Sequence, residues 1–321
     1  MLNVIPVTVP GYAQPLVEAC TAWLVTTFFS IPVSFFRIFI EAPIDVWRSL
    51  SSSDPDVVLI TGANSGIGAS LAETYAKPDV TLGLLARDER LELIAEKCRD
   101  KGANVITISC DIANKEDLAG ALIEFDESNP IDLLIANAGQ AGVTDDGSAW
   151  EDSWQGIMDV NLKGTINTVM TVFKLMEERP HIGGQIAITS SVAAWHAPPQ
   201  LCYYSATKAA LTSLGRDLRY IGRNYNIKVN VIAPGLIGTR MTLGERKPYP
   251  FSSWFTASPK NLANIIRWNL FEDNFVITWP YHQFLVDLAI SSLPPRVLDS
   301  VQWLIGGAWS VVSPAEDKPL T

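Results

Sequence analysis

The chain has 321 residues, enough for one α/β domain of ordinary size with extensions, and 18% of them are charged, below the ~25% usual for soluble domains. Its net charge of -10 argues against nucleic-acid binding and against electrostatic attraction to an anionic membrane, so any lipid contact must be hydrophobic. The four cysteines form no CxxC pair and the three histidines are scattered, so neither a disulfide framework nor a metal site is indicated.

Residues 1–53 form an apolar N-terminal segment and linker. The run from Ala19 to Phe36 carries no charge, and its length is at the lower limit of the ~17 to 25 residues that span a bilayer. A membrane span, a monotopic or hairpin insertion, and packing on the protein itself stay open as hypotheses. No signal peptide is expected, because no Lys or Arg precedes the apolar run. If the segment spans, Arg37 and Arg48 place the following domain in the cytoplasm.

After the turn-rich linker at 51–55, short apolar strands alternate with longer amphipathic helices, which is typical of a parallel sheet covered by helices. Strands are predicted at Val57–Thr61, Val80–Leu85, Val105–Cys110, Leu133–Ala136, Gln185–Thr189 and Lys228–Ile232. Helices are predicted at Ile67–Ala76, Glu89–Lys101, Lys115–Glu127, Trp154–Glu178 and Ser205–Asn224. We therefore predict a Rossmann-type, doubly wound parallel sheet over residues 54–258, with an apolar segment before it and an extension at 259–321 after it.

The first predicted strand runs into the glycine-rich stretch TGANSGIG, residues 61–68, and then into a helix. Glycines there allow a tight turn and a close pyrophosphate, and the helix N-terminus supplies donors and positive potential. The spacing differs from the G-x-G-x-x-G fingerprint, so an ordinary strand-to-helix turn is the alternative. The candidate cofactor-binding residues of this turn are Gly62, Asn64, Ser65, Gly66, Ile67 and Gly68.

Arg87 follows the second predicted strand, where an acid favours NAD and an arginine accepts the 2′-phosphate of NADP. This position favours NADP(H) over NAD(H). Asp88 and Glu89 have two interpretations. Either one of their carboxylates folds back to bind the ribose, or both residues belong to the first turn of the next helix. Asp111, after the third strand, either accepts a bond from the adenine amino group or caps a helix.

The fourth predicted strand ends in small residues, Asn137, Ala138 and Gly139, which would let a cofactor lie against the backbone.

Tyr204 and Lys208 lie four residues apart at the start of a predicted helix, so their side chains share one face. A phenol has an unperturbed pKa near ~10, and a neighbouring ammonium lowers that pKa by favouring the phenolate. Tyr204 is therefore a candidate general acid for reducing a ketone and a candidate base for the reverse reaction. Ser191, thirteen residues earlier, is a candidate donor to the substrate oxygen, with Ser190 as the alternative.

These motifs together resemble the classical short-chain dehydrogenase/reductase family over residues 56–240. The resemblance consists of TGANSGIG at 61–68, ANAG at 136–139, Asn161 in DVNLKG, Ser191 in TSSVAA, YSATK at 204–208 and APG at 233–235. Ala136 is a departure, because the family often has Asn there. The resemblance implies that Asn161, Ser191, Tyr204 and Lys208 form a catalytic tetrad, in which Lys208 holds the nicotinamide ribose and Asn161 positions a proton-relaying water. It also implies that Pro234, Gly235 and Thr239 pass beside the nicotinamide.

Two apolar regions follow the motifs. The segment 241–257 is rich in Met, Leu and aromatic residues and is either a lid over an apolar substrate or a packing surface. The tail 275–309 has few charges and is either an amphipathic element in a membrane interface or a helix that covers the core or a dimer contact. Trp195 and His196, between Ser191 and Tyr204, are candidate pocket residues.

We therefore predict an NADP(H)-dependent, membrane-associated oxidoreductase that interconverts a ketone and a secondary alcohol on an apolar, lipid- or steroid-like molecule. Its architecture resembles those of membrane-associated hydroxysteroid dehydrogenases and ketosphinganine-type reductases. The alternatives are a non-catalytic NADPH-binding sensor or scaffold and a soluble cytoplasmic carbonyl reductase of small ketones. We expect no metal and no nucleic acid, and a homodimer or homotetramer.

Overall fold

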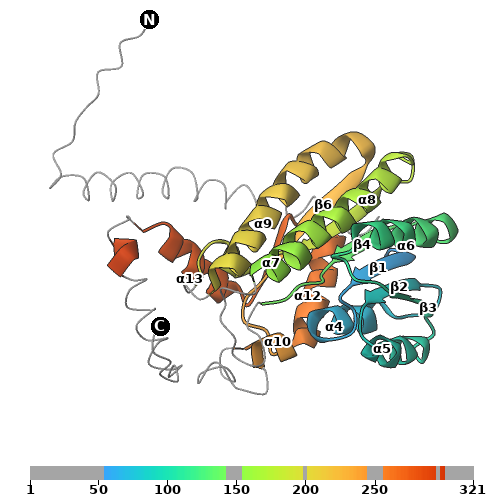
Figure 1. The fold of residues 1–321 in the computed structure, drawn as a ribbon, viewed down its shortest axis with the longest axis horizontal. Helices are drawn as coiled ribbons and strands as arrows, with labels where there is room; N and C mark the ends of the chain where they lie inside the picture. The colour runs from blue at the N-terminus through green and yellow to red at the C-terminus, as the bar shows by residue number, and fades with distance from the viewer. Residues whose placement is uncertain (1–53, 142–153, 198–200, 244–255, 294–296, 301–321) are drawn as a thin grey trace, which may run out of the picture.

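Seven short apolar runs form one parallel sheet in the computed structural model, which describes residues 54–141, 154–197, 201–243, 256–293 and 297–300 (Figure 1). The strands are β1 (Val57–Thr61), β2 (Thr81–Ala86), β3 (Asn104–Ser109), β4 (Leu133–Ala136), β5 (Gly184–Thr189), β6 (Ile227–Pro234) and β7 (Val276–Trp279). Their order is β3-β2-β1-β4-β5-β6-β7, so the chain crosses from the β3 edge back to β4 beside β1. Such a reversal opens a crevice at the carboxyl ends of the central strands.

Helices cover both faces of the sheet (Figure 1). The first face carries α4 (Gly66–Tyr75), α5 (Arg90–Arg99) and α12 (Pro259–Phe271), and the second carries α6 (Lys115–Ser128), α8 (Thr165–Glu177) and α9 (Cys202–Gly222). Shorter elements are α7 (Trp154–Ile157), the π-helical η4 (Met158–Gly164), the 3₁₀ turns η5 (Val192–Ala194) and η7 (Arg223–Tyr225), α10 (Arg240–Leu243) and α13 (Tyr281–Ser291).

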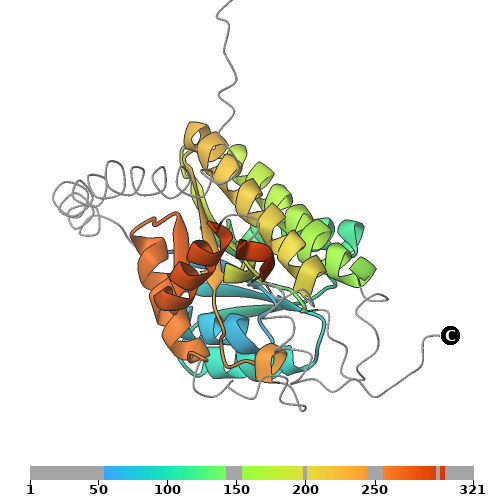
Figure 2. The same cartoon turned by 90° about the vertical axis from the view of Figure 1, so that its left-hand side faces the viewer.

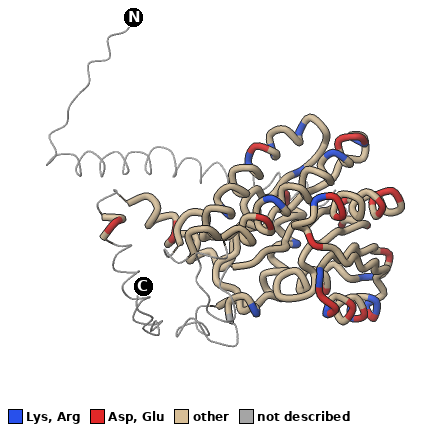
Figure 3. Tube along the Cα trace, in the orientation of Figure 1, with Lys and Arg blue, Asp and Glu red and all other residues tan. Residues whose placement is uncertain are grey.

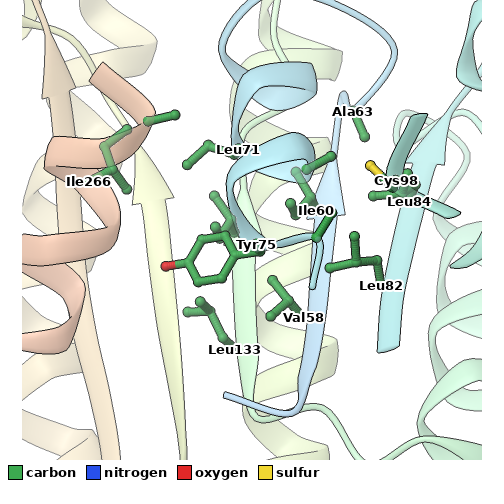
Figure 4. Close-up of a cluster of buried hydrophobic side chains, with 14 of the residues drawn as sticks. Val58, Ile60, Ala63, Leu71, Tyr75, Leu82, Leu84, Cys98, Leu133 and Ile266 are labelled. Carbon is green, nitrogen blue, oxygen red and sulfur yellow. The ribbon is translucent and has the colours of Figure 1, made fainter. Parts of the chain in front are cut away.

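The central strands β1, β2 and β4 are mostly apolar because both of their faces are buried, whereas the edge strand β3 is only partly buried. Successive side chains point to opposite faces, so Val58 and Ile60 join the core under α4 and α12, while Leu59 joins the core on the other face. Figure 4 shows the first of these cores, where β1 and β2 side chains meet α4 and α12. Burying one such side chain stabilises the fold by roughly 1.5–3 kcal/mol.

The predicted fold class is confirmed, and the six predicted strands are all present within one or two residues of their predicted bounds. The predicted helix at 154–178 is interrupted by the π-helical η4, and α9 begins at Cys202 rather than at Ser205.

The sheet continues beyond residue 258, where the sequence places the end of the catalytic domain. In α12, Leu262 and Ile266 are fully buried, and β7 pairs with β6 in the register Ile232↔Ile277. Residues 276–279, which belong to the tail predicted as either an interfacial element or a helix covering the core or a dimer contact, are a strand of the sheet. This strand pairs with a segment about 45 residues away in the chain, and no local sequence pattern indicates that pairing.

The apolar run 19–36 and most of the predicted lid at 241–257 lie outside the described residues. Within the described ranges, no helix combines the length and the apolar character needed to cross a bilayer.

Candidate active site

A cavity of about 370 Å³ lies at the carboxyl ends of the central strands. The predicted site residues that line it are Gly62, Asn64, Ser65, Gly66, Ile67, Arg87, Asp111, Asn137, Ala138, Gly139, Ser191, Tyr204, Lys208, Pro234, Gly235 and Thr239. Gly68 and Asn161 are predicted site residues that do not line it. The walls also contain Gln140, Arg90 and Arg240, which the motifs do not single out. Gln140 directly follows the ANAG motif, and this position is the sequence signal that indicates it as a site residue.

The glycine turn is fixed by close backbone contacts. Gly62 has a φ of +66° and donates its N–H to Leu85 O at 2.7 Å. A Cβ on Gly62 would lie 2.8 Å from Ala138 Cα, and a Cβ on Gly68 would lie 2.2 Å from Gly62 O. Gly68 therefore permits α4 to pack on the turn, although it does not line the cavity.

The beginning of α4 faces the cavity through Ser65, Gly66 and Ile67. The Ser65 side chain makes no capping hydrogen bond, so the first-turn N–H groups of α4 keep the positive potential that attracts an anion. Open glycine backbone beside a helix N-terminus fits the pyrophosphate of a dinucleotide.

Replacing Gly62 with Ala is expected to lower the melting temperature, because the left-handed backbone costs an L-residue roughly 1–2 kcal/mol and the new Cβ meets Ala138. The matched control is Gly120→Ala in α6, where a Cβ meets nothing within 4 Å. That change is expected to raise stability by about 0.5–1 kcal/mol. Thermal unfolding of both variants checks the pair, and equal melting temperatures would contradict the described turn.

Arg87 directly follows β2 and lines the cavity; its Nη1 donates to Asp111 Oδ2 at 3.0 Å, and its side chain is 61% exposed. Asp111 also accepts from Ala113 N–H at 2.9 Å. The cap of α6 is Asn114, whose side chain accepts from Asp117 N–H. Asp111 is therefore not the capping residue of α6.

Asp88 also lines the cavity, but its carboxylate is engaged by Arg90. It accepts from Arg90 N–H at 2.8 Å and from Arg90 Nε at 2.8 Å. The side-chain and backbone hydrogen bonds from Arg90 hold the pKa of Asp88 at about 2. Asp88 therefore precedes α5 as an ionised residue paired with Arg90, and Arg87 is a largely exposed cation at this end of the cavity.

The candidate proton-transfer groups meet at the start of α9. Lys208 Nζ lies 5.5 Å from the centre of the Tyr204 ring, as the i, i+4 spacing predicts. The ammonium donates to Thr189 O at 2.9 Å, and burial lowers the pKa of Lys208 to about 8. Adjacent β5 and β6 bring Ser191 to the same cavity, where its Oγ donates to Pro234 O at 3.3 Å.

The two candidate serines have different surroundings. Ser190 is buried, and its Oγ donates to Lys208 O at 2.8 Å and lies 2.7 Å from Thr212 Oγ1. These contacts tie the end of β5 to α9. Ser191 begins η5 and accepts from Ala193 N–H at 3.2 Å. Both serines line the cavity, but the Ser191 hydroxyl makes a longer bond to its carbonyl partner, 3.3 Å against 2.8 Å for Ser190.

Asn161 lies in the π-helical η4, and its side chain is fully buried. Its Nδ2 donates to Gln140 O at 2.7 Å, and its Oδ1 accepts from Gln140 N–H at 2.8 Å. The side chain thus fixes the segment after β4 beside the cavity. The water-positioning role that the resemblance implies for Asn161 stays a prediction.

Trp195 and His196 do not line the cavity. Trp195 instead makes an edge-to-face contact with Phe284 of α13, with ring centres 5.0 Å apart. Thr239 lies against the glycine turn, because its Cγ2 would be 3.1 Å from a Cβ on Gly66.

Comparison with known proteins agrees with this geometry. The family model described as short chain dehydrogenase matches residues 56–249. The chain is 41% identical over 192 residues to "11-beta-hydroxysteroid dehydrogenase-like 3" of Arabidopsis thaliana, which covers 58% of this chain and 60% of that protein. It is 32% identical over 228 residues to "11-beta-hydroxysteroid dehydrogenase A" of Sesamum indicum, with 68% of this chain and 62% of that protein covered.

Among solved structures, a short-chain dehydrogenase from Sphingobium yanoikuyae in complex with NADPH matches with a TM-score of 0.62 and 25% identity. That match covers 82% of this chain and 98% of the other. The matches to the two plant proteins span only about 60% of their lengths. The family match, the sheet order and the residues around the cavity lead to one conclusion: this chain belongs to the short-chain dehydrogenase family and has its oxidoreductase fold.

Proposed function

We propose that the protein is an NADP(H)-dependent oxidoreductase that interconverts a ketone and a secondary alcohol on an apolar, steroid- or lipid-like substrate. The observation that carries the proposal is the shared cavity, in which Ser191, Tyr204 and Lys208 face the glycine turn. The nicotinamide, when bound, supplies or accepts the hydride.

The protein side of the reaction is proton transfer at Tyr204. In reduction the phenol donates its proton to the oxygen of the substrate carbonyl, and the Lys208 ammonium stabilises the phenolate that forms. Ser191 donates a hydrogen bond to the same oxygen as negative charge develops on it. In oxidation the phenolate accepts the alcohol proton.

The names of the plant relatives support a hydroxysteroid as the substrate class. The test is NADPH consumption with an 11-ketosteroid, a long-chain 3-keto lipid and a small ketone such as cyclohexanone, each at equal concentration. Faster turnover of the steroid or the lipid supports the proposal. NADPH binding without turnover of any ketone supports a sensor or scaffold, and exclusive turnover of cyclohexanone supports a small-ketone reductase.

Arg87→Ala is expected to raise the KM for NADPH about tenfold or more and to leave the KM for NADH unchanged. A charge-assisted hydrogen bond to the 2′-phosphate contributes roughly 1.5–3 kcal/mol, and NADH has no such phosphate. The matched control is Arg99→Ala in α5, since Arg99 pairs with Glu92 and does not line the cavity. If wild type prefers NADH, a residue other than Arg87 determines the choice between the two cofactors.

We also propose that α13 contacts a lipid surface. Tyr281, Leu285 and Val286 are 55%, 47% and 55% exposed, and Asp287 is the only charged residue of this helix. Figure 3 shows Lys, Arg, Asp and Glu gathered mainly at the ends of α5, α6, α8 and α9 that lie farthest from α13. An apolar face in a charge-poor region suits a neutral bilayer and a substrate dissolved in it.

Leu285→Glu is expected to reduce co-sedimentation of the full chain with phosphatidylcholine vesicles at least threefold, because it places a charge in the proposed lipid contact. Leu93→Glu is the matched control, since Leu93 is 59% exposed on α5 at the other end of the molecule. Equal sedimentation of both variants and wild type would contradict lipid contact by α13.

A further inference from the structure

The first turn of α13 holds the loop that follows β6. Two consecutive N–H groups of this loop are bound from the C-terminal part of the chain: Gly235 N–H donates to Trp279 O at 3.0 Å, and Leu236 N–H donates to Gln283 Oε1 at 2.6 Å. The amide lies so close that a Cβ on Gly235 would be 2.1 Å from Gln283 Oε1. The Gln283 side chain of α13 thus adds a contact to a loop that β7 holds through Trp279 O and that Ala257 holds through Gly238 N–H.

The same loop touches Ser191. The carbonyl oxygen of Pro234 accepts the Ser191 hydroxyl, so the orientation of that hydroxyl depends on where the loop lies. The loop also carries Gly235 and Thr239, which line the cavity, and Thr239 lies against the glycine turn.

A second contact from α13 reaches the other side of Ser191. Phe284 follows Gln283 directly and packs edge-to-face on Trp195, which ends η5. The first turn of α13 thus contacts both the loop after β6 and the turn that begins at Ser191. Figure 2 shows α13 in red, facing the viewer, at this end of the molecule.

We infer that Gln283 is a positioning residue of the active site. Its amide oxygen fixes the backbone of the loop after β6 and thereby aligns the Pro234 carbonyl with the Ser191 hydroxyl and holds Gly235 against the cofactor space. The part of the glutamine that makes this contact is its side-chain oxygen, and a carboxylate oxygen of the same reach can accept the same N–H. The inference rests on the proposed function, and it places the loop beside the nicotinamide as the family resemblance implies.

The test compares Gln283→Leu, which has similar bulk without an acceptor, with Gln283→Glu, which keeps an oxygen in place. The control is His282→Ala, an exposed neighbour on the same helix. The measurements are the NADPH dissociation constant from its fluorescence, kcat and KM with the ketone found by screening, and the melting temperature of each variant.

Gln283→Leu is expected to weaken NADPH binding and to lower kcat about threefold to tenfold each, while Gln283→Glu and His282→Ala stay within about twofold of wild type. If Gln283→Glu behaves like wild type while Gln283→Leu does not, the loss in Gln283→Leu comes from the missing hydrogen-bond acceptor and not from altered packing. Unchanged NADPH binding and kcat in Gln283→Leu, or equal losses in the Leu and Glu variants, would overturn the inference. NADPH binding can be compared between the variants even if wild type reduces no ketone. A wrong inference about Gln283 can therefore be told apart from a wrong proposed function.

Discussion

Tyr204→Phe is expected to reduce ketone turnover by about 10²- to 10⁴-fold while NADPH binding stays near that of wild type. The substitution removes only the phenolic hydroxyl of a ring whose centre lies 5.5 Å from Lys208 Nζ. The ring remains and keeps the packing of α9. Steady-state rates with saturating NADPH, together with NADPH fluorescence titration, separate loss of chemistry from loss of binding.

The adjacent tyrosine provides a matched control. Tyr203 packs on Trp154, with ring centres 6.3 Å apart, and is not among the residues that line the cavity. Tyr203→Phe is therefore expected to retain turnover within about threefold, since most substitutions away from reacting groups have small effects. Retained turnover in Tyr204→Phe would refute the proton-transfer role and favour a binding protein that uses the same fold.

Lys208→Met is expected to reduce turnover by about 10²-fold or more and to remove a pH dependence that wild type shows near pH 8. Burial lowers the pKa of Lys208 from 10.5 to about 8, so the ammonium is present below pH 8 and is lost above it. Because the ammonium stabilises the Tyr204 phenolate, the rate of ketone reduction in wild type is expected to fall as pH rises through about 8. Rates of wild type and Lys208→Met from pH 6 to 10 check this.

The lowered pKa of Lys208 also predicts how the free energy of unfolding changes with pH. The unfolded chain binds the Lys208 proton up to pH 10.5, whereas the folded chain releases it near pH 8, so this group makes the free energy of unfolding rise between those values. Subtracting the stability–pH curve of Lys208→Met from that of wild type isolates this increment. Lys163→Met is the control, since Lys163 is exposed and paired with Asp159. A difference curve that is flat above pH 8 would show that Lys208 is not desolvated.

Part of the site could be predicted from local sequence alone. Tyr204 and Lys208 share a face because a helix repeats every 3.6 residues, and the glycine turn follows from residues that tolerate positive φ, as Gly62 does. Six strands were visible because buried strands are continuous apolar runs between turn residues. All of these signals lie within one element or one turn.

The sequence by itself determined the family fold, the glycine turn and the spacing of the proton-transfer groups, because those features depend on neighbours within a few residues. Only the tertiary structure decided that Ser190 bonds to α9 while Ser191 bonds to Pro234 O at the end of β6, and that residues 276–279 complete the sheet. It also decided that Gln283 holds Leu236, 47 residues earlier in the chain. These outcomes depend on which distant segments of the chain pack together. A local sequence pattern does not indicate contacts between residues that meet only when the sheet forms.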